Sequence, residues 1–138
     1  FANWPGVLKP RKSPVPMHMV DWFPTIASLV GYKPAKDLQW DGINQWPVLT
    51  GHLSDNQVPE RSIYIAMRNG QALRHGSWKL IQNADYPPEL YHLESDPYET
   101  TNLAESEPKK LKALQQRLAD QRALENPTLP ADLEGLPR

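Results

Sequence analysis

Proline is the residue type that most limits what this chain can fold into, because it makes up 15 of the 138 residues. A proline has no backbone N–H and a fixed φ, so it is poorly tolerated inside helices and in the middle of sheets. Prolines spread along a chain therefore break it into short pieces. The sequence predicts one loop-rich domain built from short helices and strands, long enough to bury a hydrophobic core.

Composition excludes several classes of function. The formal net charge is −1, which gives no electrostatic reason to bind nucleic acid or an anionic membrane. There is no cysteine, so disulfides, thiolate metal sites and a cysteine nucleophile are excluded for this chain. No apolar run approaches the roughly 18 residues of a membrane span, and we expect no membrane partner.

The first predicted element is a helix over about residues 20–30. Asp21 suits the N-cap, Pro24 is tolerated in the first turn, and Gly31 is placed to end the helix. Its apolar residues share one face and are expected to be buried; they are Met19, Phe23, Ile26, Ala27 and Val30. Residues 32–60 show little periodicity, and we expect an irregular segment with one helical turn at most.

The second half of the chain predicts strands followed by a helix. Residues 62–67 alternate with the period of a strand, and Asn69-Gly70 is a strong hairpin signal. Three further short strands are expected at 71–74, 77–81 and 89–93, forming an antiparallel meander. Pro108 can start a helix whose stripe is Leu111, Leu114 and Leu118. Residues 126–138 are expected to be a poorly ordered tail.

Few residues point to chemistry. The four histidines, at positions 18, 52, 75 and 92, never fall at the i, i+4 spacing of a helical zinc pair. Asp37 and Asp41 lack the alternating oxygen ligands of a calcium-binding EF-hand loop. No nucleophile elbow and no phosphate-binding loop is present, and Trp22 and Trp78 suit a core better than a sugar platform. The residues alone indicate an α+β module and no more.

Four blocks in order carry a resemblance to the sulfatase family, closest to arylsulfatase B-type (N-acetylgalactosamine-4-sulfatase-like) enzymes. Each is a short stretch of the family's carboxy-terminal end. They are Phe1-Ala2-Asn3-Trp4-Pro5-Gly6; Val20-Asp21-Trp22-Phe23-Pro24-Thr25-Ile26; Asp41-Gly42 with Leu49-Thr50-Gly51; and residues 72–81 with 89–103, which contain Trp78-Lys79-Leu80-Ile81, Glu89-Leu90-Tyr91-His92-Leu93 and Asp96-Pro97-x-Glu99-x-x-Asn102-Leu103.

The resemblance implies an α+β fold that is the C-terminal part of an alkaline-phosphatase-like α/β sulfatase. Residues 1–67 would be the tail end of the large α/β core, and residues 68–125 a four-stranded antiparallel sheet packed on a C-terminal helix. The turn at Asn69-Gly70 favours direct pairing of its two flanking strands, whereas the resemblance implies that strand 62–67 joins the large sheet. We adopt the second interpretation. If the large sheet is absent, that strand and the apolar stripe of helix 20–30 would be open to solvent.

The chemistry implied by the resemblance lies outside this chain. Sulfatases use a formylglycine made from the Cys or Ser of a C/S-x-P-x-R motif, together with calcium. This chain has no Cys, and no Arg follows Ser13-Pro14-Val15-Pro16. No catalytic residue, metal ligand or cofactor is therefore expected here. The expected partners are the N-terminal catalytic part of the same sulfatase and a sulfated small molecule or glycan. The full-length enzyme is expected in the periplasm or outside the cell, or in the lysosome of a eukaryote.

The resemblance also suggests substrate contacts at the end of strand 62–67. Ala66 occupies the matching place, and Arg68 and Asn69 flank it. An arginine there can hold a sulfate or carboxylate by a bidentate contact. The competing interpretation is a solvated arginine beside a turn.

Two other functions remain open. The chain could be a stand-alone module whose tryptophans bind a sulfated glycan. It could also be part of another hydrolase of the alkaline phosphatase superfamily, such as a phosphonate or phosphodiester hydrolase.

Overall fold

The computed structural model describes residues 1–38 and 40–124. The chain divides into two compact units, Phe1–Glu60 and Arg61–Arg138, and each is considered by itself. Over the described ranges, no helix has both the length and the apolar character needed to cross a membrane. The predicted tail at 126–138 lies outside the described residues.

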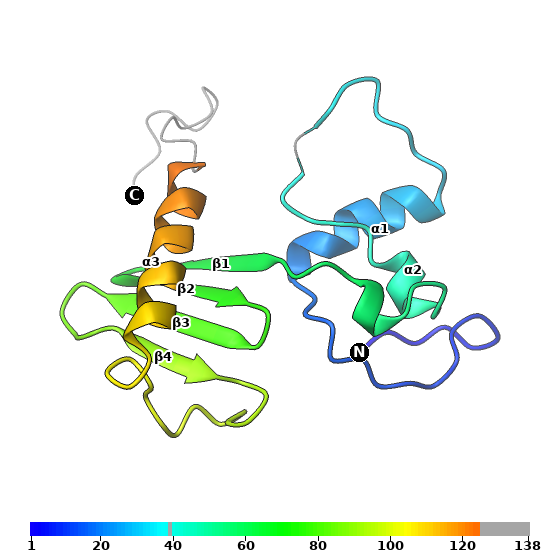
Figure 1. Ribbon diagram of the computed structural model, residues 1–138. Helices are drawn as coiled ribbons and strands as arrows, with labels where there is room; N and C mark the ends of the chain where they lie inside the picture. The colour runs from blue at the N-terminus through cyan, green and yellow to red at the C-terminus, as the bar shows by residue number, and fades with distance from the viewer. Residues whose placement is uncertain (39, 125–138) are drawn as a thin grey trace. The chain divides into compact units, whose positions relative to one another are not determined.

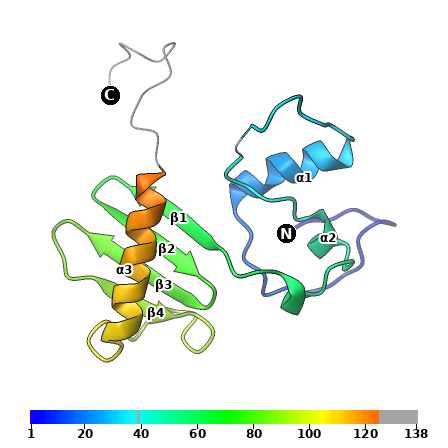
Figure 2. The same ribbon diagram turned by 45° about the horizontal axis from the view of Figure 1, so that its top comes forward.

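The second unit is a four-stranded antiparallel meander with one helix across a face of the sheet (Figures 1 and 2). The strands follow chain order as β1 (Ser62–Met67), β2 (Gly70–His75), β3 (Trp78–Asn83) and β4 (Glu89–His92), and the helix is α3 (Pro108–Ala123). The four-stranded sheet and C-terminal helix predicted from the sequence are therefore confirmed.

The sheet assignment of strand 62–67 corrects the sequence-based interpretation. β1 pairs with β2 along its whole length, from Ser62 opposite His75 to Met67 opposite Gly70. Because only Arg68 and Asn69 connect the two strands, the chain must reverse directly into an antiparallel neighbour. The hairpin favoured by Asn69-Gly70 forms, and the expectation that this strand joins a separate, larger sheet is wrong. The break between units lies before β1, at Glu60 and Arg61.

The core of the second unit lies between the sheet and α3. Leu73, Leu80 and Leu90, each fully buried, come from three successive strands. Leu114 and Leu118 of α3 pack in the same cluster and are also buried, as their helical spacing predicted. Tyr64, on β1, packs against this cluster at its edge. Burying an aliphatic side chain of this size contributes about 1.5–3 kcal/mol, so these five leucines dominate the stability of the unit.

The connection from β4 to α3 is held by side chains of the Asp96–Asn102 block. Asp96 accepts hydrogen bonds from the backbone N–H groups of Thr100 (2.8 Å) and Thr101 (2.9 Å), which lowers the pKa of its carboxyl group. The side-chain oxygen of Asn102 accepts the N–H of Leu90 at 2.9 Å, on the outer edge of β4. This block therefore ties the loop to the sheet, which is a structural role.

The first unit contains a 3-10 turn η1 (Met19–Asp21) that runs into α1 (Trp22–Leu29), a short helix α2 (Trp46–Leu49) and a 3-10 turn η2 (Asp55–Gln57). The predicted helix at 20–30 therefore forms as η1 and α1. The single helical turn expected within 32–60 is represented by α2. Asp21 is completely buried, and its carboxylate accepts the backbone N–H groups of His18 at 2.7 Å and Ile43 at 3.0 Å.

The expected burial of the apolar stripe is wrong for this structure. Of its five residues only Ala27 is buried, while Met19 and Val30 are 81% and 73% exposed. The residues that the unit does bury are Asp21 of η1 and Pro24, Thr25 and Ala27 of α1. Helical spacing shows that apolar residues share a face, but it does not show whether anything covers that face.

Candidate functional site

The predicted substrate contacts lie together at one end of the sheet. Ala66 pairs with Gln71 near the end of β1, and Arg68 and Asn69 form the turn into β2. All three side chains are exposed. The carbonyl oxygen of Asn69 accepts the backbone N–H of Ala84 at 3.0 Å, so the turn is fixed to the chain that leaves β3. The exposed guanidinium group of Arg68 therefore lies on a hairpin turn that is held by a backbone hydrogen bond.

A residue that the sequence did not single out also lies at this tip. Asn83 ends β3 opposite Gly70, and its side-chain oxygen occupies the space that a Cβ on Gly70 would need. Gly70 is therefore required for close packing of β2 against Asn83, beyond its part in the turn. The side chain of Asn83 adds an amide near Arg68 and Asn69. Only the strand register, which the sequence does not specify, brings it there.

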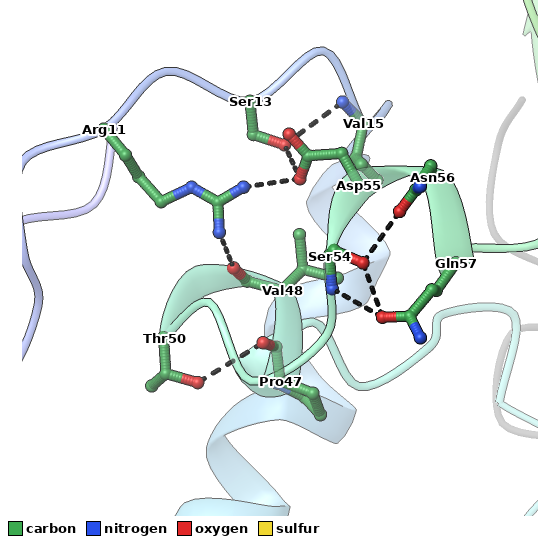
Figure 3. A network of polar contacts seen from close by, with 10 residues as sticks. All are labelled: Arg11, Ser13, Val15, Pro47, Val48, Thr50, Ser54, Asp55, Asn56 and Gln57. Carbon is green, nitrogen blue, oxygen red and sulfur yellow. Dashed lines mark hydrogen bonds and ion pairs between the residues drawn. The ribbon is translucent and has the colours of Figure 1, made fainter.

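The N-terminal loop of the first unit contains the basic stretch Lys9-Pro10-Arg11-Lys12. Its Arg11 is not open to an anion. Figure 3 shows that the guanidinium group of Arg11 donates one hydrogen bond to the carbonyl oxygen of Val48 at 2.8 Å and another to Asp55 at 2.5 Å. Ser13 donates a hydrogen bond to the same oxygen of Asp55 at 2.9 Å. These contacts join the N-terminal loop to α2 and η2. Arg11 and Ser13 thus stabilise the fold by anchoring this loop.

A cavity of about 550 Å³ lies within the first unit. Its lining is mainly apolar, with side chains from the N-terminal loop, α1 and α2 that include Leu8, Met17, Trp22 and Val48. Arg11 is among its polar lining residues, but its guanidinium is already paired with Asp55. The cavity therefore suits an apolar group better than a sulfate ester.

Three of the four histidines, at positions 52, 75 and 92, have local structural partners. His52 Nδ1 lies 2.6 Å from Thr50 Oγ1, and His75 Nδ1 lies 3.2 Å from Ser62 Oγ. His92 contacts Ser95 through Nδ1 and meets the ring of Trp78 edge-on at 4.7 Å. These contacts favour the structural interpretation of each ring over a ligand role.

Tyr91 has a raised pKa, and its hydroxyl group lies against Glu89. The tyrosine hydroxyl donates a hydrogen bond to Glu89 at 2.6 Å, and this bond, together with burial, raises the pKa of Tyr91 to about 12. The phenol consequently stays protonated at neutral pH. It is a structural hydrogen-bond donor and is unsuited to act as a general base.

The described residues were compared with what a metal ion or a formylglycine site requires. Within residues 1–38 and 40–124, no three His, Cys, Asp or Glu side chains gather closely enough to hold a metal ion. Ser13, the serine before Pro14, donates its hydroxyl hydrogen to Asp55 and belongs to the Arg11 network. No step of a reaction can be assigned to a metal or a formylglycine held by these residues.

Comparison with known proteins shows that this chain is similar to sulfatases. No family model matches it. The N-acetylgalactosamine-6-O-sulfatase of Bacteroides thetaiotaomicron is 27% identical over 133 residues, covering 86% of this chain and 26% of the relative. The choline-sulfatase of Rhizobium meliloti is 33% identical over 104 residues, covering 74% of this chain and 20% of the relative.

Solved structures agree in fold. A 6S-sulfatase from the glycosaminoglycan metabolism of Bacteroides thetaiotaomicron superposes with a TM-score of 0.72 at 25% identity, over 87% of this chain and 28% of the other. The phosphonate monoester hydrolase of Agrobacterium radiobacter has a TM-score of 0.55 at 24% identity, over 75% of this chain and 24% of the other, and it shows the fold alone.

The family prediction is confirmed at the level of sulfatases, and the narrower likeness to arylsulfatase B-type enzymes stays a prediction. The alkaline-phosphatase-like fold class is also confirmed, as the C-terminal part that the sequence motifs indicated. This chain is a sulfatase homologue that spans about a fifth to a quarter of the curated sulfatases it matches.

Proposed function

We propose that this chain is the C-terminal segment of a sulfatase that hydrolyses sulfate esters of aryl compounds or carbohydrates. The alignment with two sulfatases carries the proposal, since it covers most of this chain and only a small share of each relative. The chemistry, with its calcium and formylglycine, belongs to an N-terminal catalytic part of the same enzyme. This segment supplies structural support and one edge of the substrate pocket.

The pocket edge is the hairpin tip of Arg68, Asn69 and Ala66. Arg68 is exposed on a turn that a backbone hydrogen bond to Ala84 holds in place. A guanidinium group on this turn can hold a second sulfate or a carboxylate of a glycan by paired hydrogen bonds. Ala66, with the smallest side chain of the three, leaves room for the sugar beside it.

The first test is activity with and without the upstream part. The DNA before the codon for Phe1 should encode the C/S-x-P-x-R motif, and the complete product should hydrolyse 4-nitrophenyl sulfate. The isolated chain should give no turnover above the buffer control, with or without calcium, because it lacks a nucleophile and metal ligands. If a preparation of the isolated chain that contains no co-purified sulfatase hydrolysed the ester, the proposal that the catalytic groups lie in the upstream part would be wrong.

The second test concerns Arg68. In the complete enzyme, Arg68→Ala should raise KM for a sulfated disaccharide about tenfold, since a charge-assisted hydrogen bond contributes about 1.5–3 kcal/mol. The kcat for 4-nitrophenyl sulfate should not change. Arg117→Ala, at an exposed position of α3, is the matched control. If Arg68→Ala and Arg117→Ala had the same KM for the sulfated disaccharide, Arg68 would not be a substrate contact.

A second candidate, which the sequence leaves open, is a phosphonate or phosphodiester hydrolase of the same superfamily. Comparing 4-nitrophenyl sulfate with 4-nitrophenyl phenylphosphonate on the complete enzyme separates the two. If the complete enzyme hydrolyses the phosphonate with the higher kcat/KM, phosphonate esters and not sulfate esters are its substrate class. The third interpretation, a stand-alone glycan-binding module, predicts that the isolated chain binds a sulfated glycan with no upstream part present.

A further inference from the structure

Asn69 is the only asparagine in this sequence with a glycine directly after it. Its side chain is exposed on the turn that joins β1 to β2. Because Gly70 has no side chain, its backbone nitrogen can approach the side-chain carbonyl carbon of Asn69 without steric hindrance. A bond between these two atoms would close a five-membered ring.

Other asparagine side chains in the chain are fixed by hydrogen bonds. The oxygen Oδ1 of Asn44 accepts the backbone N–H of Trp46 at 2.9 Å, and that of Asn102 accepts the N–H of Leu90 at 2.9 Å. Within residues 1–38 and 40–124, no such bond fixes the side chain of Asn69. The amide of Asn69 can therefore rotate until its carbonyl carbon meets the next backbone nitrogen.

The backbone of this turn favours the same reaction. The carbonyl oxygen of Asn69 accepts the N–H of Ala84 at 3.0 Å, and it belongs to the peptide bond that contains the nitrogen of Gly70. When this nitrogen loses its proton, resonance places part of the negative charge on that oxygen. The hydrogen bond from Ala84 and the positive charge of Arg68 in the same turn stabilise the anion. The fold thus favours the anionic nitrogen, which is the attacking group.

We propose that Asn69-Gly70 is a modification site, where the chain converts its own asparagine into aspartate or isoaspartate through a succinimide. The Gly70 nitrogen loses its proton to water and bonds to Cγ of Asn69. The bond from Cγ to Nδ2 breaks, and Nδ2 takes up a proton from water and leaves as ammonia. Water then adds to one of the two ring carbonyl carbons. Breaking the bond from Cγ to the ring nitrogen gives aspartate, whereas breaking the backbone C–N bond gives isoaspartate.

The conversion changes the charge of the hairpin tip. A neutral amide becomes a carboxylate beside Arg68, so the formal net charge of −1 becomes more negative by one. The consequence for substrate rests on the proposed function, in which Arg68 holds a sulfate or carboxylate. The new carboxylate pairs with the guanidinium group and repels such an anion. Because the lost ammonia does not return, the conversion permanently weakens binding of a sulfated glycan.

Peptide mapping by mass spectrometry tests the site in the unsubstituted chain, incubated at mildly alkaline pH in buffer and in concentrated urea. Asn83 is the internal control, since it ends β3 at the same tip but is followed by Ala84. In the folded chain, conversion at Asn69 should be at least tenfold faster than at Asn83. Asn69→Gln should not form the more acidic species on ion exchange. Conversion in urea but not in buffer would overturn the proposal, as would equal conversion at the two asparagines.

The effect on substrate is measured separately in the complete enzyme. Asn69→Asp should raise KM for a sulfated disaccharide about tenfold, since the added carboxylate opposes the anion. Asn56→Asp is the matched control and should leave KM unchanged. Asn56 is exposed in the first unit, and its Oδ1 accepts the hydroxyl of Ser54 at 2.7 Å, a bond that an aspartate keeps (Figure 3).

The two measurements separate the possible failures. If Asn69→Asp had the same KM as Asn56→Asp, the consequence for substrate would be wrong, and a positive peptide map would still establish the modification site. If the complete enzyme hydrolysed no sulfate ester, the proposed function would be wrong, and the peptide map alone would decide the modification.

Discussion

The carboxylate of Asp21 accepts the backbone N–H of Ile43 at 3.0 Å across 22 positions of the chain. The same carboxylate accepts the N–H of His18, and the amide of Gln45 lies 3.4 Å from it. One buried group thus joins the start of α1 to the segment before α2. In this way the Val-Asp motif and the Asp-Gly motif of the sequence, which lie far apart, become one structural feature.

Replacing Asp21 by Ala should destabilise the first unit. The substitution removes the acceptor of two part-buried backbone donors, the N–H groups of His18 and Ile43, and each such loss costs about 1 kcal/mol. Urea denaturation measures the loss, and hydrogen exchange should accelerate at the amide of Ile43. Asp41→Ala, at an exposed position two residues before Ile43, is the control and should stay within about 0.5 kcal/mol. Equal effects of the two substitutions would contradict the role given to Asp21.

Gly42→Ala should be among the most harmful changes in the first unit. A Cβ at this position would overlap the carbonyl group of Val20 and lie 2.9 Å from the Cα of Asp21, all of them backbone atoms. Overpacking of this kind costs about 1–3 kcal/mol, and backbone atoms cannot move aside as a side chain can. Gly31→Ala is informative beside it, since Gly31 has a φ of +70° but open space around its Cβ position. A smaller loss at Gly42 than at Gly31, measured as a change in thermal midpoint, would show that the close approach is unimportant.

Leu114→Ala should destabilise the second unit by about 2–5 kcal/mol, because it creates a cavity between α3 and the sheet. Leu114 is 2% exposed, whereas Leu124 at the end of the same helix is 77% exposed. Leu124→Ala is therefore the matched control and should be close to neutral. A thermal midpoint unchanged by Leu114→Ala would mean that α3 does not pack on the sheet in solution.

Acid should loosen the loop between β4 and α3. The backbone N–H groups of Thr100 and Thr101 lower the folded-state pKa of Asp96 below its usual value of 3.8. The stability that this carboxylate contributes is present above pH 3.8 and is lost as the pH falls through its lowered folded pKa. The difference in thermal midpoint between the unsubstituted chain and Asp96→Asn should therefore shrink from pH 6 to pH 2. A difference that does not vary with pH would show that the charge of Asp96 has no part in it.

Local patterns in the sequence predicted the second unit well. The spacing of Leu111, Leu114 and Leu118 gave the buried face of α3, and Asn69-Gly70 gave the hairpin. The error at strand 62–67 came from preferring the resemblance to this local signal, although a two-residue connection leaves the chain no other neighbour.

The first unit was less predictable because its organisation depends on contacts between distant segments. The sequence predicts Asp21 as an N-cap. Its hydrogen bond with the backbone N–H of Ile43 is visible only in the three-dimensional structure. The helical period alone did not predict the exposure of Phe23 and Ile26, since it does not identify what covers a face; only the resemblance indicated that this face would be open without the large sheet. At the hairpin tip, Arg68 and Asn69 were named from the resemblance, whereas the register that adds Asn83 could not be read from residue types.

The meander also has a consequence for how the chain acquires its structure. Each strand pairs with the one made just before it, and only two residues separate β1 from β2 and β2 from β3. Closing such short loops costs little chain entropy, and proteins dominated by contacts of this kind fold in micro- to milliseconds. The first unit must instead bring Ile43 back to Asp21 before its buried carboxylate is satisfied. Stopped-flow refolding should therefore show Trp78 reaching its native fluorescence before Trp22 and Trp46 do, so that the part of the chain synthesised last is the first to become structured.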